Sequence, residues 1–293
     1  MAEITAAMVK ELLELTGLGM MECKKALGEA NGDIRQAEEL LRIKSGAKAS
    51  KAASRVAADG AVGTYLSPDA KVGALVEVNA ETDFVAKNPD FTAFTSAVAK
   101  LVAEENPADV AALSGLTIGG ETVEAARQKL VQKIGENITV RRFERVQTVR
   151  KLVQYVHPGS KVAVIVDFEG DDEVAKDVTH HIAFARPRYM TREQYPADAV
   201  AAERKIIEAR AAESGKPPEI VTKMVDGGIS KFLAENTLMG QPFVKDDKLT
   251  VEKMLAARKA KLHGYKFLVV GEGIEKKQSD FAAEVAAMTK TAA

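Results

Sequence analysis

The sequence predicts an α+β fold built around a duplicated unit. The segment from Tyr65 to Val78 aligns without gaps on the segment from Tyr155 to Phe168, with Tyr, Pro, Lys and Val recurring at one constant spacing. In each copy two apolar runs flank a proline-containing loop, as in a β-hairpin, and a helical stretch follows. Such a repeat indicates a core of two similar halves, each an antiparallel sheet with helices.

The amino-acid composition limits the classes of protein to which this chain can belong. The chain has 293 residues, 46% of them hydrophobic and 28% charged, as in ordinary globular proteins. A net charge of -1 and the absence of tryptophan give no reason to expect a direct nucleic-acid or membrane partner. The single cysteine, Cys23, excludes an intrachain disulfide. With no signal peptide and no apolar run of roughly 20 residues, we expect a cytoplasmic protein.

Residues 1–54 are expected to form a three-helix domain and a linker. Thr5 and Asp33 are N-cap candidates, and Thr16-Gly17-Leu18-Gly19 separates the first two helices. The three helices carry these apolar residues at helical spacing: Val9, Leu12 and Leu13; Met20, Cys23, Ala26 and Leu27; Ile34, Ala37, Leu40 and Leu41. Helices of this size resemble a ubiquitin-associated-like fold. The glycine loop is either a tight turn or a binding lip. The basic stretch from Lys44 to Ala58 fits a linker, helical or not, with a solvated face better than an RNA contact.

The remaining boundaries follow from changes in pattern. Residues 55–147 form the first half of the core, and residues 148–187 plus 234–270 form the second half. Between them, 188–233 reads as a protruding coiled-coil hairpin with a narrow apolar seam, which makes a second copy of the chain a candidate partner. A helix over 251–262 and a strand over 265–270 complete the second half. The C-terminal module, 271–293, contains a helix with Phe281 on its apolar stripe, either docked on its own core or offered to a partner.

The motifs of common catalytic and cofactor sites are missing. Gly215-Lys216 lacks the upstream glycine of a nucleotide-binding P-loop and is followed by proline. His180 and His181 are adjacent, about 100° apart on a helix, so one should point inward and the other outward without sharing a metal. With one cysteine there is no structural zinc site. We therefore expect no cofactor, no metal and no catalytic residues.

The stretch from Asn79 to Asn88 is the most informative part of the chain. It places Asp83 and Phe84 side by side at a strand-to-helix turn. By pattern alone Phe84 is equally well a core residue or an exposed aromatic. In the gapless alignment the second copy has Val174 at this position, so the shared packing does not require the aromatic. A contact with a partner is therefore the better interpretation.

Several motifs resemble the bacterial elongation factor Ts family, in the right order and over essentially the whole chain. The two long ones are Thr16-Gly17-x-Gly19-Met20-Met21-x-Cys23-Lys24-Lys25-Ala26-Leu27 and Glu81-Thr82-Asp83-Phe84-Val85-Ala86-Lys87-Asn88. Shorter ones are Ala57-Ala58-Asp59-Gly60, Lys133-Ile134-Gly135-Glu136-Asn137-Ile138, Gly240-Gln241-Pro242-Phe243 and Val270-Gly271-Glu272-Gly273-Ile274-Glu275.

The resemblance implies a guanine-nucleotide exchange factor for the GTPase elongation factor Tu, acting in translation elongation. It implies that the segment Thr82, Asp83, Phe84 and Val85 enters the GTPase near its switch region and displaces the Mg²⁺ ion, with Phe84 as a wedge. It also implies that His157 faces the phosphate-binding side. The partner-contacting positions that it implies elsewhere are Leu12, Thr16, Gly17, Gly19, Met20, Cys23 and Phe281.

Two other function classes remain as alternatives. A non-enzymatic adaptor could recruit partners through the ubiquitin-associated-like module alone. An enzyme could use the carboxylates of Glu81 and Asp83, but these lack a nucleophile or metal partner in the sequence.

Overall fold

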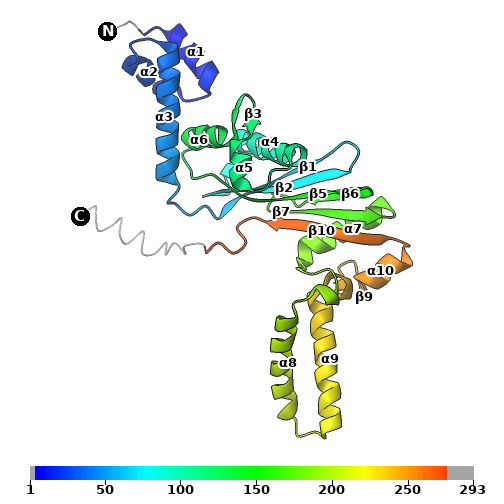
Figure 1. Cartoon of the computed structure of the whole chain (residues 1–293). Coiled ribbons are helices and arrows are strands. Elements are labelled where there is room, and N and C mark those ends of the chain that lie inside the picture. The colour runs from blue at the N-terminus through cyan, green and yellow to red at the C-terminus, as the bar shows by residue number, and fades with distance from the viewer. Residues whose placement is uncertain (1–3, 276–293) are drawn as a thin grey trace, which may run out of the picture.

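A computed structural model describes residues 4–275 (Figure 1). A small helical module lies at one end, two sheets with their helices lie in the middle, and a two-helix hairpin protrudes at the other end. The predicted α+β class is confirmed. The predicted C-terminal helix, with Phe281, lies outside the described residues. Among residues 4–275, no helix is long and apolar enough to cross a membrane.

The N-terminal module consists of α1 (Ala6–Thr16), α2 (Met20–Glu29) and α3 (Ile34–Ala52). The predicted caps are confirmed, since Thr5 Oγ1 accepts from Met8 N at 3.3 Å and Asp33 Oδ1 accepts from Gln36 N at 2.9 Å. Helix α3 continues through the predicted linker as far as Ala52. Its small side chains pack against the first half of the core, and this contact explains why the helix persists there.

The first half of the core is a three-stranded antiparallel sheet covered by helices. Its strand order is β1-β2-β5, and α4 packs on β1 and β2. The elements are β1 (Asp59–Leu66), β2 (Val72–Ala80), the 3-10 turn η1 (Val85–Lys87), α4 (Pro89–Glu105), α5 (Val110–Gly115), β3 (Thr117–Ile118), β4 (Glu121–Thr122), α6 (Val123–Ile134) and β5 (Thr139–Gln147).

The second half is also a three-stranded antiparallel sheet covered by a helix. Its strand order is β10-β7-β6, and α7 packs on β6 and β7. Its elements are β6 (Lys151–Val156), β7 (Val162–Glu169), α7 (Asp172–Ala185), η3 (Leu238–Gly240), β8 (Pro242–Phe243), β9 (Asp246–Thr250), α10 (Val251–Ala257) and β10 (Lys261–Val269). The helix expected over 251–262 is too long. It ends at Ala257 because Lys259 has a φ of 51° and Lys261 already pairs with Glu169 in the sheet.

The two halves pack through their sheets around an approximate two-fold axis. Val62 N donates to Ser160 O at 2.7 Å, and at the equivalent positions Leu152 N donates to Ala70 O at 2.8 Å. Reciprocal contacts of this kind characterise a two-fold interface. The apolar residues between the sheets are Val62, Leu75, Leu152, Ala163, Ile165 and Leu268. The predicted duplication is therefore confirmed.

The protruding hairpin pairs α8 (Ala197–Ala212) with α9 (Pro218–Asn236), and η2 (Arg192–Gln194) precedes it. Burial within the two helices is limited to Ala211, Val225 and Ile229. A Cβ on Gly228 would lie 2.9 Å from Ile207, so this glycine allows the helices to approach each other.

Candidate functional site

The loop between β2 and α4 presents an aromatic side chain to solvent. Phe84 is 78% exposed, whereas the next residue, Val85, is 5% exposed and packs in the core of the first half. The prediction that Phe84 is exposed is confirmed. A partner contact through the Val85 side chain is not compatible with its burial, because the 3-10 turn that begins there directs it inward.

Two carboxylates brace the base of this loop reciprocally. Glu136 Oε2 accepts from the N–H groups of Glu81 and Thr82 at 3.0 Å each, and Glu136 Oε1 accepts from Thr82 Oγ1 at 2.6 Å. In return, Glu81 Oε1 accepts from Asn137 N at 2.5 Å and lies 3.2 Å from Arg55 Nε. These bonds join segments distant in sequence and fix the backbone immediately before Phe84.

Asp83 and Phe84 form the exposed tip of the loop. Asp83 lies 3.7 Å from Lys87 Nζ, and its side chain remains 52% exposed. An exposed pair of this kind contributes little to stability. The tip therefore offers one carboxylate and one aromatic ring on a fixed base. Among residues 4–275, no group of three or more His, Cys, Asp or Glu side chains could hold a metal ion.

The loop is an insertion relative to the second half, which corrects the gapless alignment. Asn88 caps α4 by accepting from the N–H groups at the second and third helical positions, and Asp171 caps α7 in the same way. Phe91 and Val174 are thus the equivalent residues, and both are buried. The second half crosses from β7 to α7 with Gly170 and Asp171 alone. Phe84 belongs to a segment that the shared scaffold lacks.

The predicted contact residues of the N-terminal module divide between core and surface. Leu12 and Cys23 are 0% exposed and belong to the module's core, so their side chains cannot be contact residues in this conformation. Thr16 is half-buried and donates to Leu12 O, while Gly17 and Gly19 are exposed. Met20 shares the helical spacing of Cys23, Ala26 and Leu27 but is 64% exposed, so its side chain is available for contact.

Two exposed apolar residues beside this loop were missed by the sequence analysis. Leu15 is 57% exposed and Met21 is 74% exposed. Together with Met20 they flank the glycine loop and give this end of the module an apolar surface, here called the Leu15 patch. The available signal was that neither side chain falls on the buried stripe of its helix.

His157 is exposed in the turn between β6 and β7. Its Nδ1 lies 3.0 Å from Tyr155 Oη, and the Tyr155 ring packs edge-on against His180 at 4.3 Å. The side chain is therefore supported from one side. The expectation for the two adjacent histidines is confirmed, since His180 is exposed and His181 is buried.

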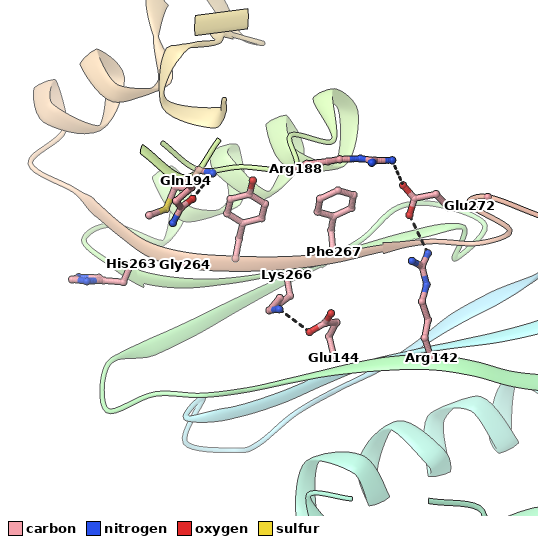
Figure 2. Close-up of a pocket in the computed structure, with 12 residues that line it drawn as sticks. Arg142, Glu144, Arg188, Gln194, His263, Gly264, Lys266, Phe267 and Glu272 are labelled. Atoms are coloured by element: carbon pink, nitrogen blue, oxygen red, sulfur yellow. Dashed lines mark hydrogen bonds and ion pairs between the residues drawn. The ribbon is translucent and has the colours of Figure 1, made fainter. Parts of the chain in front are cut away.

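A cavity of about 620 Å³ lies beside β10 (Figure 2). Lys266 and Phe267 lie on opposite faces of the strand, and Lys266 pairs with Glu144 at 2.9 Å. Arg142 and Arg188 reach Glu272 at its end, at 3.1 and 3.8 Å. Opposite charges are paired within the cavity, and none of the residues predicted to contact a partner lines it within the described chain.

The chain is similar to proteins of one family over nearly its whole length. The family model described as "Elongation factor TS" matches residues 81–272. The chain is 60% identical to elongation factor Ts of Bordetella petrii, over 98% of each chain. It is 57% identical to elongation factor Ts of Aromatoleum aromaticum, over 100% of this chain and 99% of the relative. The same protein of Chromobacterium violaceum is 57% identical, over 99% of this chain and all of the relative.

Proposed function

Because this chain belongs to the elongation factor Ts family, we propose that it is a guanine-nucleotide exchange factor for elongation factor Tu. It binds the GDP form of the GTPase, loosens GDP and leaves the site open for GTP. No covalent bond is made or broken, so the chain needs no catalytic residues or cofactor of its own.

The observation that carries this proposal is the exposed Phe84 on a loop braced by Glu136. An apolar ring carried on a backbone that is already braced can enter a partner with a smaller loss of conformational entropy. In the GTPase it would act as a wedge beside the Mg²⁺ ion that bridges the protein and the GDP phosphates. Mg²⁺ requires near-octahedral coordination, so a small displacement of its ligands weakens its binding strongly. Asp83 would change the polar contacts near the ion.

The remaining contacts would orient the factor on the GTPase. His157 would face the phosphate-binding side, the Leu15 patch with Gly17 and Gly19 would contact the GTPase domain, and Phe281 would add a contact from the C-terminal segment. Thermodynamic linkage then sets the outcome: the factor weakens GDP binding by the same ratio by which GDP weakens binding of the factor.

The test is to mix the chain with elongation factor Tu loaded with fluorescent GDP and to follow GDP release by stopped flow. We expect release to accelerate with increasing concentration of the chain until it saturates. Release at the spontaneous rate at every concentration would contradict the proposal.

The Leu15 patch also keeps the adaptor alternative open, because an exposed apolar surface on a small module can recruit a partner by itself. A pull-down of elongation factor Tu separates the two functions. The adaptor requires the Leu15 patch but not the Phe84 loop, whereas the exchange factor requires both.

We propose the hairpin as a site of self-association. Ile206, Ile220 and Met224 are 46%, 45% and 36% exposed on its two helices. Sedimentation velocity of the full chain and of its Ile220→Asp variant tests this, with the variant expected to sediment as the smaller species.

A further inference from the structure

Tyr155 is a half-buried tyrosine on β6 whose hydroxyl group the proposed contacts do not use. Its ring packs against the core of the second half and meets His180 of α7 edge-on, with 4.3 Å between the ring centroids. Its hydroxyl oxygen lies 3.0 Å from Nδ1 of His157, two residues farther along the chain. The core thus holds the tyrosine from behind, while its polar end meets the exposed histidine.

A β-turn fixes the backbone of His157. Pro158 and Gly159 occupy the two central positions, Gly159 has a φ of 84°, and Ser160 N donates to His157 O at 2.9 Å, as in a type II turn. His157 N also donates to Val162 O at 2.8 Å. The freedom that remains to His157 is the rotation of its side chain, and the bond to Tyr155 restrains this rotation.

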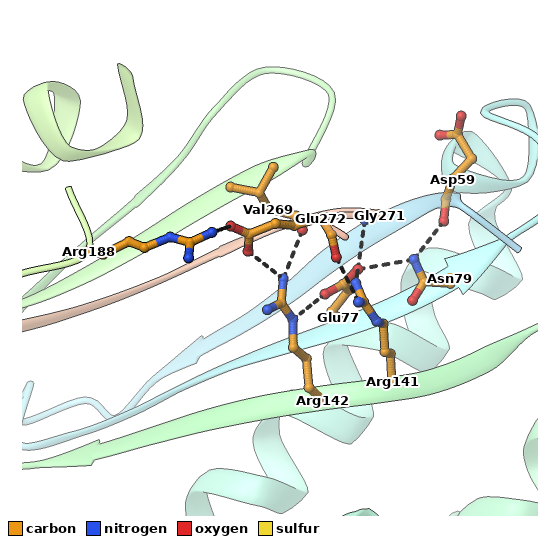
Figure 3. Close-up of polar contacts among 9 residues, drawn as sticks. All are labelled: Asp59, Glu77, Asn79, Arg141, Arg142, Arg188, Val269, Gly271 and Glu272. Atoms are coloured by element: carbon orange, nitrogen blue, oxygen red, sulfur yellow. Dashed lines mark hydrogen bonds and ion pairs between the residues drawn. The ribbon is translucent and has the colours of Figure 1, made fainter. Parts of the chain in front are cut away.

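The same turn is joined to the first half of the core. Lys161, at the end of the turn, pairs with the carboxylate of Asp59 at the start of β1. Asp59 O accepts from Asn79 Nδ2 at 3.1 Å, on the strand that leads to the Phe84 loop (Figure 3). The backbone that carries His157 is therefore kept in a constant relation to that loop.

The first half of the core shows that the duplicated turn does not need a histidine. At the position of His157 it carries Ser67, whose Oγ accepts from two backbone N–H groups of its own turn, at 2.9 and 3.1 Å. Within residues 4–275 the side chain of His157 bonds to Tyr155 instead, and its Nε2 has no partner. The histidine does not close its own turn, so its side chain is available for a contact.

The chemistry of the two groups decides which of them donates the hydrogen bond. A neutral imidazole carries its proton on one nitrogen and accepts with the other, whereas a phenol can donate or accept. Phenol is the more acidic group and the imidazole nitrogen the more basic one, so the stronger arrangement has Tyr155 Oη donating to His157 Nδ1. The ring proton then lies on Nε2, because the bond made by one ring nitrogen sets the state of the other.

We propose that Tyr155 is a positioning residue for His157. It holds the neutral ring in one orientation and in the tautomer with its proton on Nε2, so that the turn presents one N–H donor to an acceptor oxygen of the partner. This inference rests on the proposed function, in which His157 faces the phosphate-binding side of the GTPase. Without Tyr155 the ring would spread over several orientations and two tautomers, and the apparent affinity would fall with the fraction that can bind.

The duplicated unit supplies a matched control. Tyr155→Phe removes one oxygen and keeps the ring that packs on the core and on His180. Tyr65→Phe removes the hydroxyl of the equivalent tyrosine, which packs on the core of the first half and has Ser67 two residues beyond it. Both variants should fold, because each retains its packed ring.

Nitrogen-15 NMR of the full chain measures the tautomer without the GTPase. At about pH 8.5, where an ordinary histidine is neutral, we expect His157 to carry its proton on Nε2 and none on Nδ1. His157→Ala assigns the signals by their loss. Tyr155→Phe should lower the ratio of the Nε2–H to the Nδ1–H tautomer about threefold, which corresponds to a part of one net hydrogen bond, and Tyr65→Phe should not change it. A proton on Nδ1 in the unsubstituted chain, or a ratio that Tyr155→Phe leaves unchanged, would overturn the inference.

The kinetic experiment is a double-mutant cycle on GDP release from elongation factor Tu. We expect Tyr155→Phe to raise the concentration of the chain needed for half-maximal release about fivefold, the ratio for loss of one net hydrogen bond, and to leave the saturated rate unchanged. In a His157→Ala background, Tyr155→Phe should cause no further change, because no ring remains to be positioned. Tyr65→Phe should have no effect. If Tyr155→Phe acted equally in both backgrounds, the hydroxyl would not work through His157 and the inference would be wrong.

The acceptor oxygen can belong to the GDP phosphates or to the protein loop that holds them. Calorimetric binding to the nucleotide-free GTPase distinguishes these sources. Tyr155→Phe should weaken that complex about fivefold if the oxygen belongs to the protein, and should leave it unchanged if the oxygen belongs to GDP. Failure of the unsubstituted chain to accelerate release would instead contradict the proposed function, whatever tautomer the NMR spectra show.

Discussion

Gln154 donates a hydrogen bond from its side-chain amide to Thr64 Oγ1 at 2.7 Å, and the two residues occupy equivalent positions of the duplicated unit, 90 positions apart. Equivalent residues touch each other only close to a two-fold axis. The axis therefore passes near this pair, between the facing sheets. The Phe84 loop belongs to one half and His157 to the other, so this interface keeps the two proposed contacts at a constant separation.

The apolar interface around that axis should contribute strongly to stability. Leu152 is 1% exposed between the two sheets, and Leu152→Ala should lower the free energy of unfolding by about 3 kcal/mol. Chemical denaturation measures this. Val149→Ala is the control, because Val149 is 87% exposed and its truncation should change stability by less than about 0.5 kcal/mol. Equal effects of the two substitutions would show that the interface does not hold the halves together.

Phe84→Ala should slow GDP release from elongation factor Tu without affecting the fold. Loss of a central aromatic anchor costs about 2 kcal/mol or more in many interfaces, which corresponds to a reduction of roughly 30-fold or more. Stopped-flow release with fluorescent GDP measures the rate, and thermal unfolding checks stability. Phe184→Ala, at a side chain that is 77% exposed outside the loop, controls for the general loss of an exposed aromatic. Release that stays as fast as with the unsubstituted chain would rule out the wedge.

Phe84 is exposed as predicted, although the comparison that favoured its exposure paired it with Val174, whose true counterpart is Phe91. The duplicated core could be predicted from sequence because it follows from comparison of the two copies. The insertion of the Phe84 loop could not be predicted. An alignment without gaps hides the insertion, because it pairs Phe84 with Val174. Three-dimensional capping by Asn88 and Asp171 was needed to find the true register.

The contact of Glu136 with the base of the Phe84 loop could not be predicted from the sequence pattern either. Glu136 acts on Glu81 and Thr82 across more than fifty positions, and no periodicity links such residues. The burial of Leu12 and Cys23 shows a further limit of sequence reading. A family motif does not tell which of its residues form the contact surface and which lie buried beneath that surface. Their roles separate only when the burial of each side chain is known.

Glu136→Gln should loosen the base of the Phe84 loop. The carboxylate accepts three hydrogen bonds through two oxygens, and the amide would retain one acceptor oxygen. We expect a loss of about 1–2 kcal/mol in the free energy of unfolding and a slower release of GDP, by about tenfold, because the wedge is less well positioned. Thr82→Val combined with Glu136→Gln should be less than additive. Full additivity would mean that Glu136 acts elsewhere.

His181 should make stability depend on pH. Burial lowers the pKa of His181, and the hydrogen bond with Gln241 opposes this only in part. Nδ1 accepts from Val244 N at 3.2 Å, so the ring is neutral there and must give up this bond when it is protonated. Below pH 6.5, the ordinary pKa of histidine, the unfolded chain binds a proton that the folded chain resists, so the free energy of unfolding falls as the pH drops through this window.

Denaturation at about pH 7.5 and about pH 5.5 measures the effect, since these values bracket the titration of the unfolded chain. His181→Asn should be less stable than the unsubstituted chain at the higher pH, by about 1–3 kcal/mol, because the smaller side chain loses the stacking on Phe243 and the hydrogen bond with Gln241. The variant should also lose less stability on acidification. The neighbouring His180 is exposed, so His180→Asn should keep the full pH dependence. If His181→Asn retained that dependence as well, the buried ring would not be its source, and other groups that titrate in this range would have to carry it.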